Sequence, residues 1–191
     1  MAALRVSIKL ATGTGRRFAL GMGQLNWIHF PKSHLPSNEV FEVIRSFEQV
    51  LQSVDSSRHE HDSNAVLAAI EPGLTKAGFK VETSKKSEDK IAVPVLFGLN
   101  GAIDKTFNVD AHHASGRVVV EVEAGRAVVN NQFLKDFVEA CMMQDVDHVV
   151  IAVRNDYRGK NDFTAVVAFF DALYASRRMV LPLKGVLILG Y

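Results

Sequence analysis

The chain has a single cysteine, Cys141, and no uninterrupted apolar run that approaches the length of a transmembrane helix. One cysteine excludes an internal disulfide, and its place on the apolar side of a predicted helix indicates a buried free thiol rather than a nucleophile. The N-terminus also lacks the continuous apolar region of a secretory signal. We therefore expect a cytoplasmic protein that has no membrane partner.

The chain also has no marked excess of positive or negative charge, because 22 lysines and arginines balance 21 aspartates and glutamates. The formal net charge of +1 neither indicates nor excludes a nucleic-acid partner, since only the binding face of such a protein has to be basic. Internal repeats and low-complexity segments are missing, and 48% of the residues are apolar, enough for a full core. The length predicts a single domain over residues 1–191.

Residues 1–60 are interpreted as an N-terminal elaboration of this domain. Residues 5–11 alternate as in a strand, and glycines at 13–17 and 21–23 fit turns. These glycines lack the spacing of a P-loop or a dinucleotide fingerprint, so hairpin turns are favoured over a phosphate-binding loop. An amphipathic helix follows from residue 38 to 54, and its apolar stripe packs either on the core or against a partner.

Residues 62–191 are interpreted as the core of the domain. Helical periodicity predicts helices at about 63–77, with a kink or restart at Pro72, at about 129–143 and at about 163–176. Alternating or continuous apolar runs predict strands at 79–83, at 91–97, as a hairpin within 107–126, at 147–153 and at 185–191. This order of elements predicts an α/β fold in which helices flank a mixed β-sheet.

Three acidic side chains gather on the predicted hairpin. A two-residue loop at Ser115-Gly116 closes it. Strand pairing then places Asp110 directly opposite Glu121, with Cβ atoms about 5 Å apart. Glu123 follows one pleat further along the same face, because side chains alternate along a strand. Opposed like charges destabilise a sheet, so these carboxylates either lie in open water, as on an ordinary polar face, or hold a cation between them.

Three other groups have two interpretations each. Glu71 is either a surface or capping carboxylate or a fourth acid aimed at the hairpin. His59 and His61, in a polar loop, are interpreted as exposed residues rather than metal ligands. His112 and His113 lie close to the acids in the sequence, and we favour a bystander role for both.

A helix that bears a glutamate, a hairpin with the pattern Asp-x10-Glu-x-Glu, a further helix and a buried strand resemble the PD-(D/E)XK restriction-endonuclease core. The resemblance covers residues 62–155. The general motif ends in lysine where this chain has Glu123, and in this respect the chain is similar to the type II restriction-enzyme group of BamHI, BglII and BstYI. Residues 120–137, VEVEAGRAVVNNQFLKDF, look like the second motif strand and the following helix of that group. The dipeptide Val109-Asp110 departs from the family's Pro-Asp.

The resemblance implies a restriction-endonuclease-like fold and a Mg²⁺-dependent endonuclease that hydrolyses DNA phosphodiester bonds, with Mn²⁺ as a substitute. It implies that Asp110 and Glu121 are the primary metal ligands and that the Val122 carbonyl is a further one. Glu123 would then orient or deprotonate the attacking water or help to bind a second metal, and Glu71 would complete the shell through water. Clustered carboxylates do suit a hard cation such as Mg²⁺.

The resemblance also implies double-stranded DNA and a second copy of the chain as partners, because the enzymes of this group cleave both strands as homodimers. The helix at 38–54 or the helix at 129–143 would form the dimer interface. Asn130, Asn131 and Gln132 fit either adenine recognition or the capping of the helix that follows, which we favour. Basic residues just beyond the motif and after the buried strand are expected to contact DNA: Arg126, Lys135, Arg154, Arg158 and Lys160.

Two other functions are compatible with the same residues. The first is a catalytically inactive DNA-binding or assembly protein that has kept the hairpin. The second is a carboxylate-dependent hydrolase of a small phosphorylated substrate. That enzyme would have a closed pocket in place of a groove lined by Arg126, Arg154 and Arg158.

Overall fold

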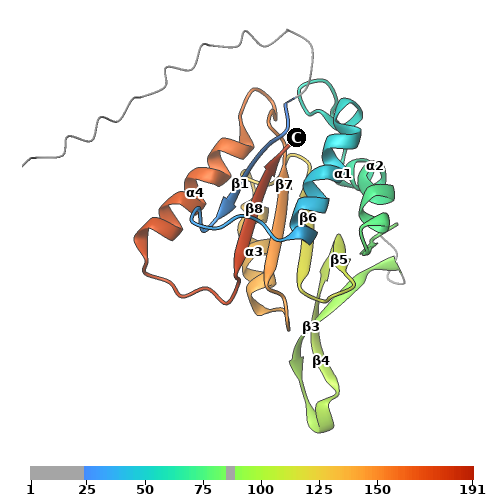
Figure 1. Cartoon of the computed structure of the whole chain (residues 1–191), viewed down its shortest axis with the longest axis vertical. Coiled ribbons are helices and arrows are strands. Elements are labelled where there is room, and N and C mark those ends of the chain that lie inside the picture. Colours follow the sequence, from blue (N-terminus) through green and yellow to red (C-terminus); the bar gives the residue numbers. More distant parts are fainter. Residues whose placement is uncertain (1–23, 85–88) are drawn as a thin grey trace, which may run out of the picture.

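The computed structural model describes residues 24–84 and 89–191. Within these ranges the protein has an α/β fold, in which a six-stranded mixed β-sheet is flanked by helices and a two-stranded arm projects from the sheet (Figure 1). The predicted α/β class is confirmed. The strand predicted at 5–11 and the glycine turns before residue 24 lie outside the described residues.

The central sheet has the strand order β1-β8-β7-β6-β5-β2. Strands β6, β7 and β8 are parallel, whereas β1 and β5 run antiparallel to their neighbours β8 and β6. The continuous apolar runs predicted at the C-terminal half form β7 and β8, which are buried on both faces of the sheet. The strands of this sheet are β1 (Asn26–Phe30), β2 (Phe79–Val81), β5 (Ala111–His113), β6 (Val118–Glu123), β7 (His148–Val153) and β8 (Gly185–Gly190).

Helices α1 (Asn38–Val54) and α2 (Ser63–Lys76) cover one face of the sheet. Ser37 caps α1 by accepting a hydrogen bond from the Val40 amide at 3.4 Å. The apolar stripe of α1 is buried in the core with the valines of β6. This stripe is therefore a core contact and is not available to a partner.

Helix α2 passes through Pro72 without interruption, so the predicted restart does not occur. Ile70 and Leu74, on either side of the proline, are both fully buried in the core, and this packing supports a continuous helix. Asp62 caps the helix through the Ala65 amide at 2.8 Å, and Gly78 follows its end with a φ of 91°.

Helices α3 (Gln132–Met142) and α4 (Asp162–Ser176) lie on the opposite face, where they enclose a second core with Val119 of β6. Helix α3 starts later than predicted, and Asn131 precedes it in the left-handed region without a side-chain capping bond. The expected capping by Asn131 was therefore wrong.

In the part of the chain that the structure describes, no helix is long and apolar enough to cross a membrane.

The strand predicted ahead of the hairpin turn is broken at Asp110. The segment before the break, β4 (Ile103–Val109), pairs with β3 (Ile91–Phe97) in the projecting arm (Figure 1). The segment after the break is β5, which pairs with β6 in the register predicted from the turn, Ala111 with Val120 and His112 with Val119. The pairing in the arm shifts register at Pro94, where proline favours an edge strand or a bulge.

Candidate active site

The alternation of β6 separates its valines from its glutamates. Val118, Val120 and Val122 enter the core beneath α1 and α2. Glu121 and Glu123 consequently point to the other face, toward α3. Both glutamates lie near the C-terminal end of a parallel strand, where open α/β sheets place their ligands.

Asp110 lies at the break between the arm and the central sheet, next to β6. Its Oδ2 accepts a hydrogen bond from the Val122 amide at 2.7 Å, which fixes the carboxyl group beside the two glutamates. Burial raises the pKa of Asp110 to about 6, against the lowering effect of this hydrogen bond. The predicted proximity of Asp110 and Glu121 is present, since the Asp110 charge contributes to the raised pKa of Glu121.

Glu121 and Glu123 are both held in an environment that disfavours their charges. Burial is the largest cause of the raised pKa of Glu121, and the charges of Asp110, Asp136 and Glu123 add to it. Burial also raises the pKa of Glu123, followed by the charge of Asp136 and a hydrogen bond with it. In these groups the effects of burial and of neighbouring carboxylates outweigh the lowering effect of Lys135.

Asp136, on α3, is the fourth member of this group and was missed in the sequence. Its side chain is 5% exposed, and its Oδ2 has no hydrogen-bond partner among the described residues. Burial raises the pKa of Asp136 to about 6. The available signal was its spacing, because Asp136 follows Phe133 by three residues on the apolar stripe of α3. An acidic residue on a buried stripe needs a partner or a ligand. We call Asp110, Glu121, Glu123 and Asp136 the acid cluster.

Two lysines lie at the rim of the acid cluster. Lys135 Nζ is 3.2 Å from Glu139 and 3.9 Å from Asp136. Burial alone would lower the pKa of Lys135. The nearby carboxylates of Glu139, Asp136 and Glu121 raise it by more, so the net shift is upward. Lys90 Nζ contacts both carboxylate oxygens of Glu82 at 3.2 Å. The charges of Lys90 and Glu82 both act on Asp110, with opposite signs.

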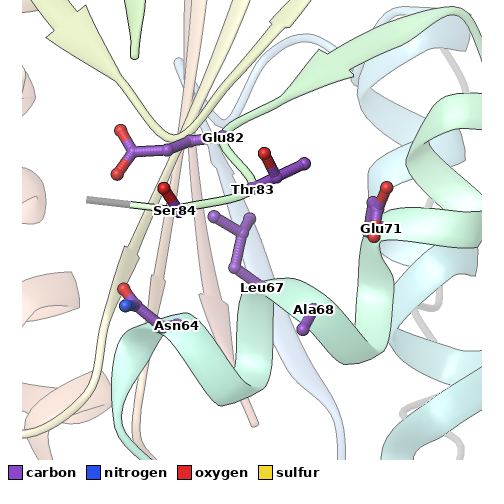
Figure 2. Close-up of a pocket in the computed structure, with 7 residues that line it drawn as sticks. All are labelled: Asn64, Leu67, Ala68, Glu71, Glu82, Thr83 and Ser84. Atoms are coloured by element: carbon purple, nitrogen blue, oxygen red, sulfur yellow. The ribbon is translucent and has the colours of Figure 1, made fainter. Parts of the chain in front are cut away.

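Glu71 is not part of the acid cluster. It belongs to α2, which covers the sheet face opposite to Glu121 and Glu123. Figure 2 shows Glu71 and Glu82 at opposite ends of a small pocket between α2 and the segment that follows β2, with the Glu82 carboxylate directed away from Glu71. The interpretation of Glu71 as a surface carboxylate fits this position better than the role of a fourth acid.

The predicted DNA-contacting residues divide into exposed and buried ones. Arg126, Lys135, Arg158 and Lys160 are exposed. Arg154 is only 6% exposed, and it donates to the His61 carbonyl. The buried side chain holds the loop after β7 against the loop between α1 and α2, and its role as a DNA contact stays a prediction.

The histidines have structural contacts that explain most of their positions. His59 and His61 stack on each other and contact the main-chain carbonyls of Gln52 and Ser53 near the end of α1. His113 contacts the Ala77 carbonyl at 3.2 Å. These contacts support the interpretation of the loop histidines as residues outside a metal site.

The donor atoms of the acid cluster are of the type that a hard cation prefers, although their arrangement here is not that of a metal site. Its donors are all carboxylate oxygens, one of them is a buried oxygen without a partner, and their mutual repulsion would be relieved by a divalent ion. The Val122 amide is held at Asp110, which keeps the main chain at Val122 beside the cluster. Across residues 24–84 and 89–191, no three His, Cys, Asp or Glu side chains form a group arranged to hold a metal ion.

The chain was also compared with known proteins. No protein-family model matches it, and no curated protein matches it either.

Proposed function

We propose that the protein is a metal-dependent endodeoxyribonuclease of the PD-(D/E)XK type, most similar to type II restriction enzymes. The single observation that carries this proposal is the acid cluster. Four carboxyl groups from the broken strand, β6 and α3 converge on one face of the sheet, where burial and mutual repulsion raise their pKa values. Such a group of buried acids destabilises the fold unless a bound ligand compensates their charges.

In this proposal Asp110 and Glu121 hold Mg²⁺ or Mn²⁺, with the Val122 carbonyl as a further ligand. The bound ion supplies Lewis acidity at the scissile phosphate and lowers the pKa of a water molecule. Glu123 accepts the proton of the attacking water, and its raised pKa suits a general base that operates near neutral pH. Asp136 lies beside Glu123, raises its pKa together with burial and would help to position it.

The proposed substrate is double-stranded DNA. Arg126, Arg158 and Lys160 are exposed in the loops that follow β6 and β7, and Lys135 is exposed at the rim of the acid cluster. These cations would contact phosphates of the DNA backbone. We further propose a cytoplasmic homodimer. Helix α1 is excluded as its interface by its buried stripe, whereas α3 exposes Val138 and Met142, each 45%.

The alternative is a catalytically inactive DNA-binding or assembly protein on the same fold. The observation that favours it is Glu123, which occupies the position of the lysine in the general motif. In this alternative the basic residues still bind DNA, but the acid cluster holds no metal ion.

Cleavage of unmethylated phage and plasmid DNA separates these functions. The DNA is incubated with the protein in Mg²⁺, in Mn²⁺ and in EDTA. Discrete fragments that require metal are expected for a sequence-specific endonuclease, and their ends would give the site. A smear would identify a nonspecific nuclease. Intact DNA, together with no Mg²⁺ or Mn²⁺ binding by calorimetry, would support the inactive protein.

A further inference from the structure

A cavity lined by three arginines lies beyond the end of β6, outside the acid cluster. It has a volume of about 270 Å³, and its walls include Arg126, Arg154, Tyr157 and Arg158. A second cavity of about 340 Å³ shares Arg154 and Arg158 with it. We call the first one the arginine cavity. Its polar lining and its three guanidinium groups indicate a site for an anion.

Arg154 forms a buried charged wall of this cavity. The residue is 6% exposed and donates to the His61 carbonyl, and its guanidinium lies 5.3 Å from the ring centre of Tyr157. Burial raises the pKa of Asp162 and the charge of Arg154 lowers it, yet within the described residues no carboxylate oxygen lies within 4.0 Å of the Arg154 nitrogens. Buried charges in proteins are usually paired, so Arg154 lacks the close counter-ion that its burial calls for.

Arg158 is presented to the cavity by a tight turn. The main chains of Tyr157 and Lys160 are hydrogen bonded in both directions, at 2.8 and 3.0 Å, and this places Arg158 in the left-handed region with a φ of 54°. Its guanidinium lies 5.2 Å from the Tyr157 ring centre. A non-glycine residue in this region is strained and is often found at a functional site. The ring of Tyr157 therefore holds two guanidinium groups at the same cavity.

The acidic residues of the lining do not cancel these charges. Glu60 and Asp62 also line the arginine cavity. Asp62 caps α2 through the Ala65 amide at 2.8 Å and keeps its charge, so three arginines face two carboxylates and a net positive charge remains. Among the described residues, neither Arg126 nor Arg158 has an ion-pair partner. The cavity thus has an excess of positive charge and unused donors.

The arginine cavity is connected to the acid cluster by short links. Arg126 follows Glu123 by three residues, a span of at most about 10 Å of extended chain. The Tyr191 hydroxyl donates to the Glu123 carbonyl at 3.2 Å and lies beside Arg154. A nucleic-acid strand whose phosphate lies at the acid cluster can therefore reach the cavity with a nearby phosphate.

We propose that the arginine cavity binds a phosphate group and prefers the terminal phosphate of a nucleic-acid strand over an internal one. A terminal phosphate carries close to two negative charges and three free oxygens, which match three guanidinium groups better than the single charge of a phosphodiester does. The preference for a nucleic acid rests on the proposed function. The phosphate site itself rests on the arginines alone.

Binding in EDTA tests this proposal without any cleavage. Three fluorescent single-stranded oligonucleotides of one sequence are compared, with a 5′-phosphate, with a 3′-phosphate and with neither, and inorganic phosphate is added as a competitor. We expect one phosphorylated strand to bind about tenfold more tightly than the strand without a terminal phosphate. Inorganic phosphate should abolish that difference. Equal affinities of all three strands, or no effect of inorganic phosphate, would overturn the proposal.

Single substitutions test whether the preference for a phosphorylated strand comes from the arginine cavity. Arg126→Gln and Arg158→Gln change exposed side chains, so both should fold, and each should reduce the preference for the phosphorylated strand to about twofold or less. Arg177→Gln, an exposed arginine at the end of α4, is the matched control and should leave the preference intact. An unchanged preference in both cavity variants would refute the site. A protein that shows the preference but never cleaves DNA would keep this proposal and lose the proposed function.

Discussion

The carboxyl groups of Glu123 and Asp136 lie beside each other, and the charge of Asp136 adds to the effect of burial in raising the pKa of Glu123. Two carboxylates cannot donate to each other, so a hydrogen bond can join this pair only while one of the two groups holds a proton. Glu123 comes from the end of β6 and Asp136 from the buried stripe of α3, and the contact therefore depends on how the helix packs on the sheet. Binding of a divalent cation would have to displace that proton.

Replacement of Asp136 tests its role as a positioning residue. Asp136→Asn removes a charge beside Glu123 but keeps a group that can donate to it. We expect Mg²⁺ affinity, measured by calorimetry, to fall about 10- to 100-fold, because a negative charge beside the ligand Glu121 is lost. The pH at which cleavage is half-maximal should also shift downward, because the Asp136 charge contributes to the raised pKa of Glu123. Asp104→Asn, in the exposed arm, is the matched control. Unchanged affinity and pH profile would show that Asp136 has no role at the site.

Glu123 can be changed to the lysine that the general motif has at this position. In Glu123→Lys the new ammonium group would lie beside Asp136 and could pair with it. We expect this variant to cleave DNA faster than Glu123→Ala, although more slowly than the wild type, in a single-turnover assay. Equal rates for the lysine and alanine variants would show that the position does not activate water.

The stability of the metal-free protein should fall as the pH rises through about 6. The folded-state pKa of Asp110, about 6, lies above its usual value, so the folded state holds a proton that the unfolded chain has already lost. The contribution of this group is fully present below about pH 4 and is lost as the pH rises through the folded pKa. His29 and His148 act in the opposite direction, because burial lowers both of their pKa values.

A difference between variants isolates Asp110 from the histidines. In EDTA, Asp110→Asn should unfold at a higher temperature than the wild type at pH 8, and the gap should close at pH 4. Mg²⁺ should stabilise the wild type at pH 8 and have little effect on the variant. Scanning calorimetry at each pH, in EDTA and in Mg²⁺, gives the unfolding temperatures for these comparisons. A wild type that is more stable than Asp110→Asn in EDTA at pH 8 would show that the carboxylate is not held under repulsion.

The proposed homodimer makes a prediction about α3. Met142→Glu adds a charge to its exposed apolar patch and should convert the dimer to a monomer in sedimentation experiments. Val180→Glu changes a fully exposed residue after α4 and should leave the dimer intact. A wild type that sediments only as a monomer, with and without DNA, would count against cleavage of both strands by a dimer.

The hairpin shows how far the sequence alone can lead. The register of β5 and β6 was predictable because the turn and the alternation of side chains fix it together. The break at Asp110 was not predictable, since the alternation continues through the preceding strand without a change of composition. Only the pairing of β4 with β3 draws that segment out of the central sheet.

Residues from distant segments were harder to assign. Asp136 joins the acid cluster through helix packing, and Glu71 stays outside it because α2 covers the other face of the sheet. Arg154 follows a buried strand in what is by composition a basic loop, and nothing in the local sequence indicates its burial. These three positions depend on tertiary contacts, to which local periodicity is insensitive.

The most direct test of the account is the rate of DNA cleavage in Mg²⁺ by three proteins, the wild type, Asp110→Asn and Glu71→Gln. Asp110 lies in the acid cluster and Glu71 lies on the opposite side of the sheet, so the two variants each remove one carboxylate at contrasting positions. The account predicts that the wild type and Glu71→Gln cleave at similar rates, and that Asp110→Asn is slower by about 100-fold or more. Cleavage by Asp110→Asn at the wild-type rate, or the absence of metal-dependent cleavage in the wild type, would contradict it.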